Sequence, residues 1–285
     1  MNKKMASAKR FFRAMISRRV VILGIIGTSF FALVAIFAPL IATHDITAMD
    51  PTQVMVGISR EHLLGTDMYG RDIFSRIVYG ARVSLLTGVI SVLIAALIGT
   101  FLGMVCSYYG GLVDRLIMGA CEVWNSIPQV IISMTLVTMF GGGIVNMALI
   151  LCLSCIPGII RMMRASSLSL MTSDYVLAAR LSGQSKLKIM YKHILPNSIS
   201  PIIVSATSQI GTTILMESGL SFLGVGIKVP TPSWGTILSE ARPYLMLKPL
   251  YVLAPCVCIA LLIISLNLLG DGVRDARDPS LKGET

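Results

Sequence analysis

Apolar residues fall into six long blocks, and shorter stretches that hold most of the charged residues separate them. The blocks cover residues 20–42, 83–108, 116–140, 144–160, 201–225 and 247–269. A helix that spans a bilayer needs roughly 20 predominantly apolar residues, and these blocks are of about that length. The runs are solid and lack the alternation of membrane-barrel strands, so they indicate helices. The pattern predicts an all-α integral membrane protein with six transmembrane helices.

Composition agrees with a membrane protein. Of the 285 residues, 54% are hydrophobic and 13% are charged, whereas a soluble domain carries about 25% charged residues. The formal net charge is +10, but the basic residues lie mainly in the N-terminal tail and in one internal loop, both next to apolar blocks. Aromatic residues do not alternate with them, as they would on a nucleic-acid-binding face. The charge therefore indicates membrane topology, and we expect no nucleic-acid partner.

The distribution of Lys and Arg predicts which segments face the cytoplasm, because cytoplasmic loops carry an excess of both. They are concentrated in residues 1–19, 161–200 and 271–285. We therefore expect both termini and the 161–200 loop inside. The resulting organisation is a cytoplasmic basic tail (1–19), a first transmembrane helix (20–42), an extracytoplasmic connection (43–82), a five-helix core (83–270) that includes the 161–200 loop, and a cytoplasmic C-terminal tail (271–285).

The first block is longer than the apolar region of a secretion signal, which is roughly 7–15 residues, so it predicts an uncleaved span. Two further helices are expected outside the blocks. Asp72 and Arg76 at i,i+4 spacing predict a helix over 68–82 that lies at the membrane surface before the second span. In the cytoplasmic loop, Ser185 caps a helix that we expect Pro196 to end.

The same loop predicts a short helix that serves a partner. Residues 172–174 offer N-capping side chains, 175–182 form two helical turns, and Gly183 is a natural C-cap. Ala178 and Ala179 are small, so another surface can approach the helix backbone closely. Short preformed helices of this kind are typical of segments that dock into a groove on another protein.

The spacing of residues in this loop is recognisable. Leu177, Ala178 and Ala179 are followed by three residues, Gly183, nine residues and then His193-x-Leu195-Pro196. This resembles the loop signature of binding-protein-dependent ABC importer permeases, whose usual form is E-A-A-x3-G-x9-I-x-L-P. Leu177 replaces the acid and His193 replaces the isoleucine, and both departures are familiar in the dipeptide/oligopeptide/nickel branch. Further segments similar to that branch lie at 65–76, 80–85, 220–226, 230–235 and 267–279.

The resemblance implies a type I ABC importer fold for about residues 20–280 and a place in the bacterial inner membrane. It implies a second homologous permease, two cytoplasmic ATPase subunits and an extracytoplasmic solute-binding protein as partners. ATP and Mg would be bound by the ATPases, so this chain would be no enzyme and would need no cofactor or metal. The substrates implied are di- or oligopeptides, with nickel or another metal chelate as the alternative. The residues implied in ATPase coupling are Tyr175, Leu177, Ala178, Ala179, Gly183, His193, Leu195 and Pro196.

Two acidic residues lie inside apolar blocks, and their role stays open. Glu122 and Glu217 belong either near the pathway or the dimer seam, or in helix–helix hydrogen bonds. For His193, packing at an interface is favoured over a role as ligand or proton carrier. Gly99 and Gly103 favour close helix approach within one subunit. The six cysteines favour core packing over a disulfide framework.

Other classes of membrane protein lack support in the sequence. No G-x-x-x-x-G-K-[ST], H-E-x-x-H or G-x-S-x-G motif occurs, which argues against nucleotide hydrolysis, metalloprotease and serine hydrolase chemistry. A self-sufficient secondary transporter would need coupling-ion ligands and broken helices in mid-membrane, and it has no use for a docking loop.

Overall fold

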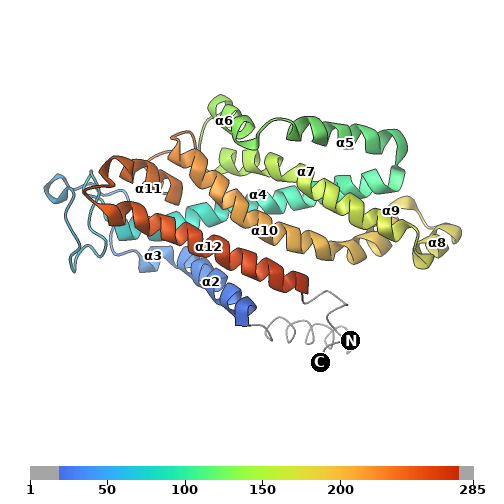
Figure 1. Cartoon of the computed structure of the whole chain (residues 1–285), viewed down its shortest axis with the longest axis horizontal. Helices are drawn as coiled ribbons and strands as arrows, with labels where there is room; N and C mark the ends of the chain where they lie inside the picture. Colours follow the sequence, from blue (N-terminus) through green and yellow to red (C-terminus); the bar gives the residue numbers. More distant parts are fainter. Residues whose placement is uncertain (1–18, 276–285) are drawn as a thin grey trace.

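The computed structural model describes residues 19–275, which form a bundle of long helices (Figure 1). Within this range there is no strand, and Thr66 and Asp72 form an isolated β-bridge. The elements are α2 (Arg19–Ile36), α3 (Ala38–Ile41), η1 (Pro51–Gln53), α4 (Ile73–Tyr109), α5 (Gly111–Asn125), α6 (Gln129–Phe140), α7 (Ile144–Met171), α8 (Asp174–Leu181), α9 (Lys186–Ile189), η2 (Met190–Ile194), α10 (Leu195–Phe222), α11 (Trp234–Ala241), η3 (Arg242–Tyr244) and α12 (Pro249–Asp275). The expected all-helical class is confirmed.

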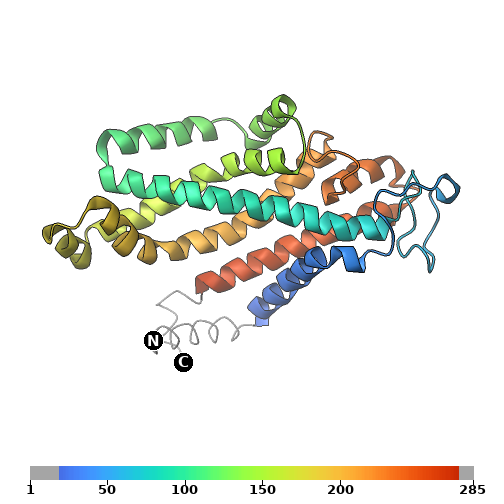
Figure 2. The ribbon, with the colours of Figure 1, turned by 180° about the vertical axis from the view of Figure 1, so that it is seen from behind.

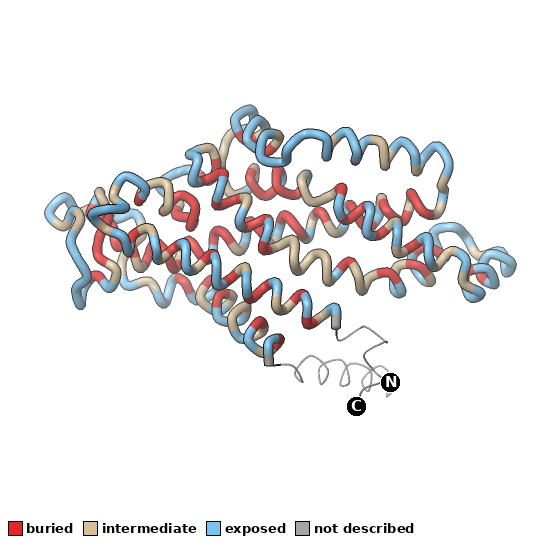
Figure 3. The backbone as a smooth tube through the Cα atoms, viewed as in Figure 1, coloured by how far each residue is buried: buried red, intermediate tan, exposed pale blue. Residues whose placement is uncertain are grey.

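The long helices run lengthwise, and the short elements gather at the two ends of the bundle (Figures 1 and 2). Helix α4 packs along α7, α10 contacts α4, α7 and α12, and α2 lies against α12. Helices α8 and α9 lie at one end, here called the α8 end. Helix α11 and the connection that contains η1 lie at the opposite end, here called the α11 end. Most of the burial follows the central helices (Figure 3).

Each predicted block corresponds to helical structure, but not each to one straight span. Four helices are long and apolar enough to cross a membrane, namely α4, α7, α10 with its preceding turns, and α12. The third block was expected to be one helix and is broken, since α5 and α6 meet at 88°. Pro128 explains the break, because it lacks an N–H donor and disfavours helical geometry at the residue before it. The first block divides at Phe37, where α2 gives way to α3.

The surface helix expected over 68–82 is wrong. Its second half is the beginning of α4, which runs without interruption from Ile73 to Tyr109. Asp72 is the N-cap of this helix and accepts a hydrogen bond from the Ser75 backbone N–H at 2.8 Å. The predicted i,i+4 pairing with Arg76 is therefore replaced by a capping interaction. The second apolar block is thus the continuation of a helix that begins at the α11 end.

Pro196 was expected to end the second loop helix, and this is also wrong. Helix α9 passes through the π-helical turn η2 directly into α10, so that 186–222 form one continuous helical segment. A π turn shifts the hydrogen-bond register, and Pro196 then falls in the first turn of α10, where its missing N–H costs little. The loop and the fifth span are thus mechanically joined.

Small residues let the two central helices approach closely. A Cβ atom placed on Gly99 would lie 2.8 Å from the Ile159 side chain, and one on Gly103 would lie 2.7 Å from that of Met163. Both contacts join α4 to α7 within this chain, as predicted. All six cysteines are free, and Cys106, Cys121 and Cys152 are buried as core packing requires, whereas Cys256 is exposed.

Candidate functional site

The α8 end carries an exposed apolar surface formed by α8, α9 and η2, which together are called the α8 tip (residues 174–194). Leu181 is 90% exposed, and Leu187 and Tyr191 are exposed by more than half. Tyr175 and Leu177 are also exposed on α8. Gly183 ends this helix with a φ of +69°, which glycine adopts without strain. Exposed apolar side chains on a short ordered helix are the chemistry of a protein-docking site.

The opposite face of the α8 tip is fixed to the bundle. Val176 and Ala179 are buried, and they belong to one hydrophobic cluster with Met104 on α4 and Met163 on α7. Two cation–π contacts reinforce the attachment, with Arg180 over the Tyr108 ring at 5.3 Å and Lys186 over the Tyr109 ring at 5.0 Å. The α8 tip is therefore in direct contact with α4, α7 and α10.

The structure separates the eight sequence-predicted coupling residues into two groups. Five of them lie on the exposed surface, namely Tyr175, Leu177, Ala178, Gly183 and Pro196. Ala179 faces the bundle, so it does not offer the close external approach expected of it. His193 and Leu195 are partly buried, and His193 Nε2 lies 3.2 Å from Gln184 Oε1. That contact joins the turn between α8 and α9 to η2 within the α8 tip, and the packing of His193 at an interface stays a prediction.

A polar groove follows α10, a feature that the sequence reasoning missed. A cavity of about 270 Å³ is lined by α10, α7 and the bend between α5 and α6. A second cavity of about 710 Å³ shares Gln209 and Thr212 with it and extends toward the α8 end. The polar groove is defined by the polar and charged residues of both cavities, Asn125, Gln129, Ser154, Arg161, Asn197, Ser200, Ser205, Ser208, Gln209, Thr212, Thr213 and Arg274.

The polar groove lies on the least hydropathic and least buried of the four long spans. Polar side chains on a spanning helix are costly against lipid and are tolerated where they face protein or water. The signal that could have revealed the groove is the spacing of Ser205, Ser208 and Thr212, which places all three on one face of a helix.

Glu217 joins three elements inside the bundle. It is completely buried, and its carboxylate accepts hydrogen bonds from Ser84 Oγ at 2.9 Å and from Ser221 Oγ at 2.8 Å. Ser84 Oγ in turn accepts from the Trp234 backbone N–H at 3.4 Å. The contacts link α4, α10 and the start of α11. Glu122 differs, because it is exposed on α5 and lies outside this arrangement.

The α11 end is held by a second set of buried charges, called the outer network (Asp67, Arg71, Arg76 and Glu240). Arg71 pairs with Asp67 at 2.6 Å and with Glu240 at 2.9 Å, while Arg76 pairs with Glu240 at 2.6 Å. Burial alone would lower the pKa of Arg71, but the carboxylates of Glu240 and Asp67 leave that pKa raised, so the guanidinium stays charged. The outer network ties the connection before α4 to α11.

Comparison with known proteins places the chain among transport components. Residues 95–283 match the family described as "Binding-protein-dependent transport system inner membrane component". A dipeptide transport system permease protein from Alkalihalophilus pseudofirmus is 38% identical over 271 residues, covering 95% of this chain and 89% of that protein. A glutathione transport system permease protein from Escherichia coli is 41% identical over 251 residues, covering 88% of this chain and 83% of that protein.

A solved structure shows the same fold. One chain of the MetNI methionine ABC transporter in an inward-facing conformation is similar to this chain with a TM-score of 0.59 at 18% identity. The likeness covers 72% of this chain and 98% of that chain. The type I importer fold expected from the sequence is therefore confirmed.

Proposed function

The chain belongs to the binding-protein-dependent transport system inner membrane components, and from that premise we propose that it forms half of the pathway through which an ATP-driven importer takes up di- or oligopeptides. It is a multi-pass inner-membrane permease subunit, and ATP hydrolysis belongs to partner ATPase chains in such systems. Relatives named for dipeptide and glutathione transport support a peptide substrate, since glutathione is itself a short peptide.

The observation that carries this proposal is the α8 tip, which is apolar and exposed outside and continuous with the bundle core inside. One ATPase subunit docks on Tyr175, Leu177, Ala178 and Leu181. Closure of the ATPases on ATP pushes the tip, and the π turn η2 transmits this motion into α10 without a flexible joint. Such a rigid element is what a switch between two packings of a bundle requires.

The polar groove supplies this chain's share of the pathway. It lies on α10 and α7, the helices to which the α8 tip is joined, so motion of the tip changes the width of the groove. A second homologous permease covers the groove from the other side, and amide and hydroxyl side chains such as Gln209 and Thr212 are suited to a peptide backbone in transit. A solute-binding protein delivers the substrate to the α11 end.

The orientation follows from the basic residues. Lys186, Lys188 and Lys192 lie in the α8 tip, so the α8 end faces the cytoplasm. Residues 1–19 and 271–285 are also rich in Lys and Arg, so the proposal puts both termini on that side. The connection at 43–72 and helix α11 then face outward.

Uptake in cells with and without this chain tests the substrate. We expect deletion to abolish accumulation of labelled di- and tripeptides, and re-expression to restore it, while the accumulation of ⁶³Ni²⁺ stays unchanged. If deletion abolished nickel accumulation and left peptide uptake intact, the substrate would be nickel or another metal chelate. Peptide uptake by this chain without its ATPase partners would instead indicate a secondary transporter.

A further inference from the structure

Two of the three histidines of the chain meet at one carboxylate at the α11 end. Side-chain donor atoms of His44, His62 and Asp72 all lie within 4.8 Å of one another. His62 Nδ1 is 2.9 Å from Asp72 Oδ1, and His44 Nδ1 is 3.9 Å from Asp72 Oδ2. His44 and His62 lie 18 positions apart in the connection and Asp72 is the N-cap of α4, so the chain brings the three together only by folding.

We propose that His44, His62 and Asp72 form a binding site for a divalent transition-metal ion of the zinc class. Two imidazole nitrogens and one carboxylate oxygen are the donor set that zinc uses when a water molecule takes the fourth position. Ligand atoms about 2.0–2.2 Å from a tetrahedral zinc ion stand about 3.3–3.6 Å apart. The separations here are 2.9 Å from His62 Nδ1 to Asp72 Oδ1 and 3.9 Å from His44 Nδ1 to Asp72 Oδ2, the other oxygen of the carboxylate, so one lies just below that range and the other just above it.

The surroundings of His62 favour a cation between it and Asp72. Its Nε2 faces Gln53 Oε1 at 2.7 Å, while its Nδ1 faces the carboxylate. A neutral imidazole has one N–H, and the tautomer in which Nε2–H donates to Gln53 is the one that directs the Nδ1 lone pair at Asp72, as metal binding requires. Metal-bound histidines commonly donate their other ring N–H to an oxygen in this way, because it fixes the tautomer that binds the ion.

The site combines a fixed part with an accessible part. His62 and Asp72 are buried, and Asp72 is held by its capping bond to the Ser75 backbone N–H. The His44 side chain is 34% exposed and its ring lies 4.6 Å from that of His62, so an ion can enter from the α11 end and draw His44 inward. Binding would fasten the end of the first span to the start of α4. It is separate from the polar groove and does not depend on which substrate is transported.

Cobalt absorption spectroscopy on the purified importer complex, prepared without a histidine tag, tests the site. Titration with Co²⁺ should produce visible bands of a tetrahedral site, and Zn²⁺ should displace them. His44→Ala changes the exposed ligand, so it spares the buried ones, and it should lower the affinity at least tenfold. Gln53→Leu should lower it roughly 10–100-fold, as expected for a partner that orients a metal ligand.

His193→Gln is the matched control, because it removes the remaining histidine at the opposite end of the molecule and should leave the bands unchanged. A second readout is the unfolding temperature of the complex, which Zn²⁺ should raise for the wild type and not for His44→Ala. Absence of Co²⁺ bands in the wild type, or wild-type bands in His44→Ala, would overturn the metal site. His62 Nδ1–H would then donate a hydrogen bond to the Asp72 carboxylate.

Discussion

At the scale of single residues, Glu217 shows how a costly group is retained in an apolar bundle. Its carboxylate is the common acceptor for hydroxyls of α4 and α10, and the Ser84 hydroxyl extends the contact to the backbone of α11. A buried polar group without partners costs roughly 1–3 kcal/mol. Removing the carboxylate would take away the acceptor to which the Ser84 and Ser221 hydroxyls donate.

We expect Glu217→Gln to retain substantial peptide uptake, because the amide preserves the shape and one acceptor oxygen. Glu217→Leu should impair assembly or the coupling of ATP hydrolysis to transport. Uptake of neutral and cationic peptides at matched expression checks both variants. If Gln were as harmful as Leu, and only cationic peptides were affected, Glu217 would act as a substrate-binding charge.

Glu240 is the shared acceptor of the outer network, so its removal should be more severe than the loss of a surface charge. Glu240→Ala leaves Arg71 and Arg76 with Asp67 as their remaining carboxylate. Breaking a buried ion pair by removing one partner costs about 3–5 kcal/mol. We expect a clear fall in the unfolding temperature of the complex. Fluorescence-detected size-exclusion chromatography after heating measures it.

Glu61→Ala is the matched control for Glu240→Ala. Glu61 is an exposed carboxylate in the connection that the outer network holds. Its loss should change stability by less than about 0.5 kcal/mol. Equal thermal shifts for the two variants would show that the outer network contributes no more than an ordinary surface charge.

At the scale of elements, the sequence predicted where helices occur better than where they end. Solid apolar runs located the long helices, because lipid requires satisfied backbone hydrogen bonds. Proline shows the difficulty. Pro128 breaks the third block, which was expected to be one helix, whereas the π turn accommodates Pro196, which was expected to end a helix. The separate surface helix expected over 68–82 was wrong for a related reason, since nothing local distinguishes such a helix from the first turns of α4.

The α8 tip, the outer network and the polar groove also differ in how far the sequence could predict them. The α8 tip could be predicted because its residues are contiguous and carry a recognisable spacing. The outer network could not, because Arg76 and Glu240 are 164 positions apart and their pairing depends on how α11 packs against α4. The polar groove also required the fold, since the bend at Pro128 brings Asn125 and Gln129 to α7 and α10.

The α8 tip yields a direct test of coupling. Leu181→Glu introduces a charge into the most exposed apolar position of the tip and should abolish peptide uptake while the subunit remains inserted. Ala178→Arg should act similarly, because a long charged side chain holds the two surfaces apart. Leu181→Met keeps the apolar contact and should behave nearly as the wild type. Co-purification of the ATPases with each variant measures docking, and unchanged ATPase recovery and uptake for Leu181→Glu would rule out this docking surface.

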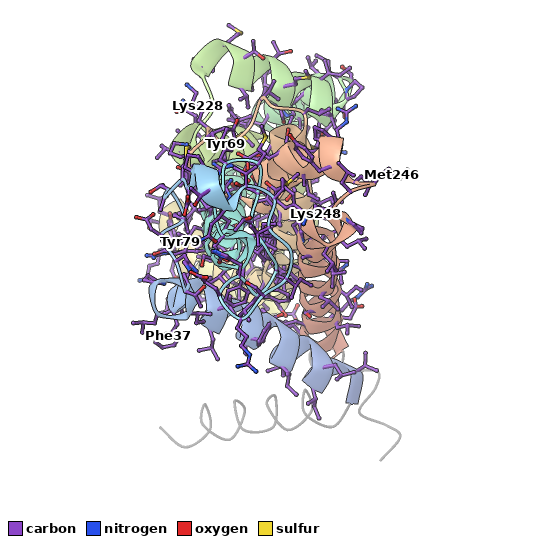
Figure 4. The ribbon with its side chains drawn as sticks, turned by 90° about the vertical axis from the view of Figure 1, so that its left-hand side faces the viewer. Phe37, Tyr69, Tyr79, Lys228, Met246 and Lys248 are labelled. Carbon is purple, nitrogen blue, oxygen red and sulfur yellow. The ribbon has the colours of Figure 1, made fainter. Side chains whose placement is uncertain are left out.

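At the scale of the whole molecule, the two ends differ in chemistry, and the bundle connects them. The α8 end is basic and carries the exposed apolar tip, whereas the α11 end is closed by the outer network and the loops around it. Figure 4 views the molecule from the α11 end, where Met246 projects at one margin of the face. Its side chain is 93% exposed. The proposed orientation therefore requires Met246 and the α8 tip to lie on opposite sides of the membrane.

Cysteine labelling with a membrane-impermeant maleimide tests that orientation. The native cysteines are first replaced by alanine or serine, since none forms a disulfide. Met246→Cys should be labelled in intact spheroplasts, because the residue is exposed on the outer side. Lys188→Cys, which is exposed in the α8 tip, should be labelled only after the membrane is permeabilised. Moving the α8 tip across the bilayer would carry Lys186, Lys188 and Lys192 through lipid, at a cost of roughly 2.5–3.5 kcal/mol for each charge. Labelling of Lys188→Cys from outside, or failure to label Met246→Cys there at matched expression, would reverse the assignment of the two ends.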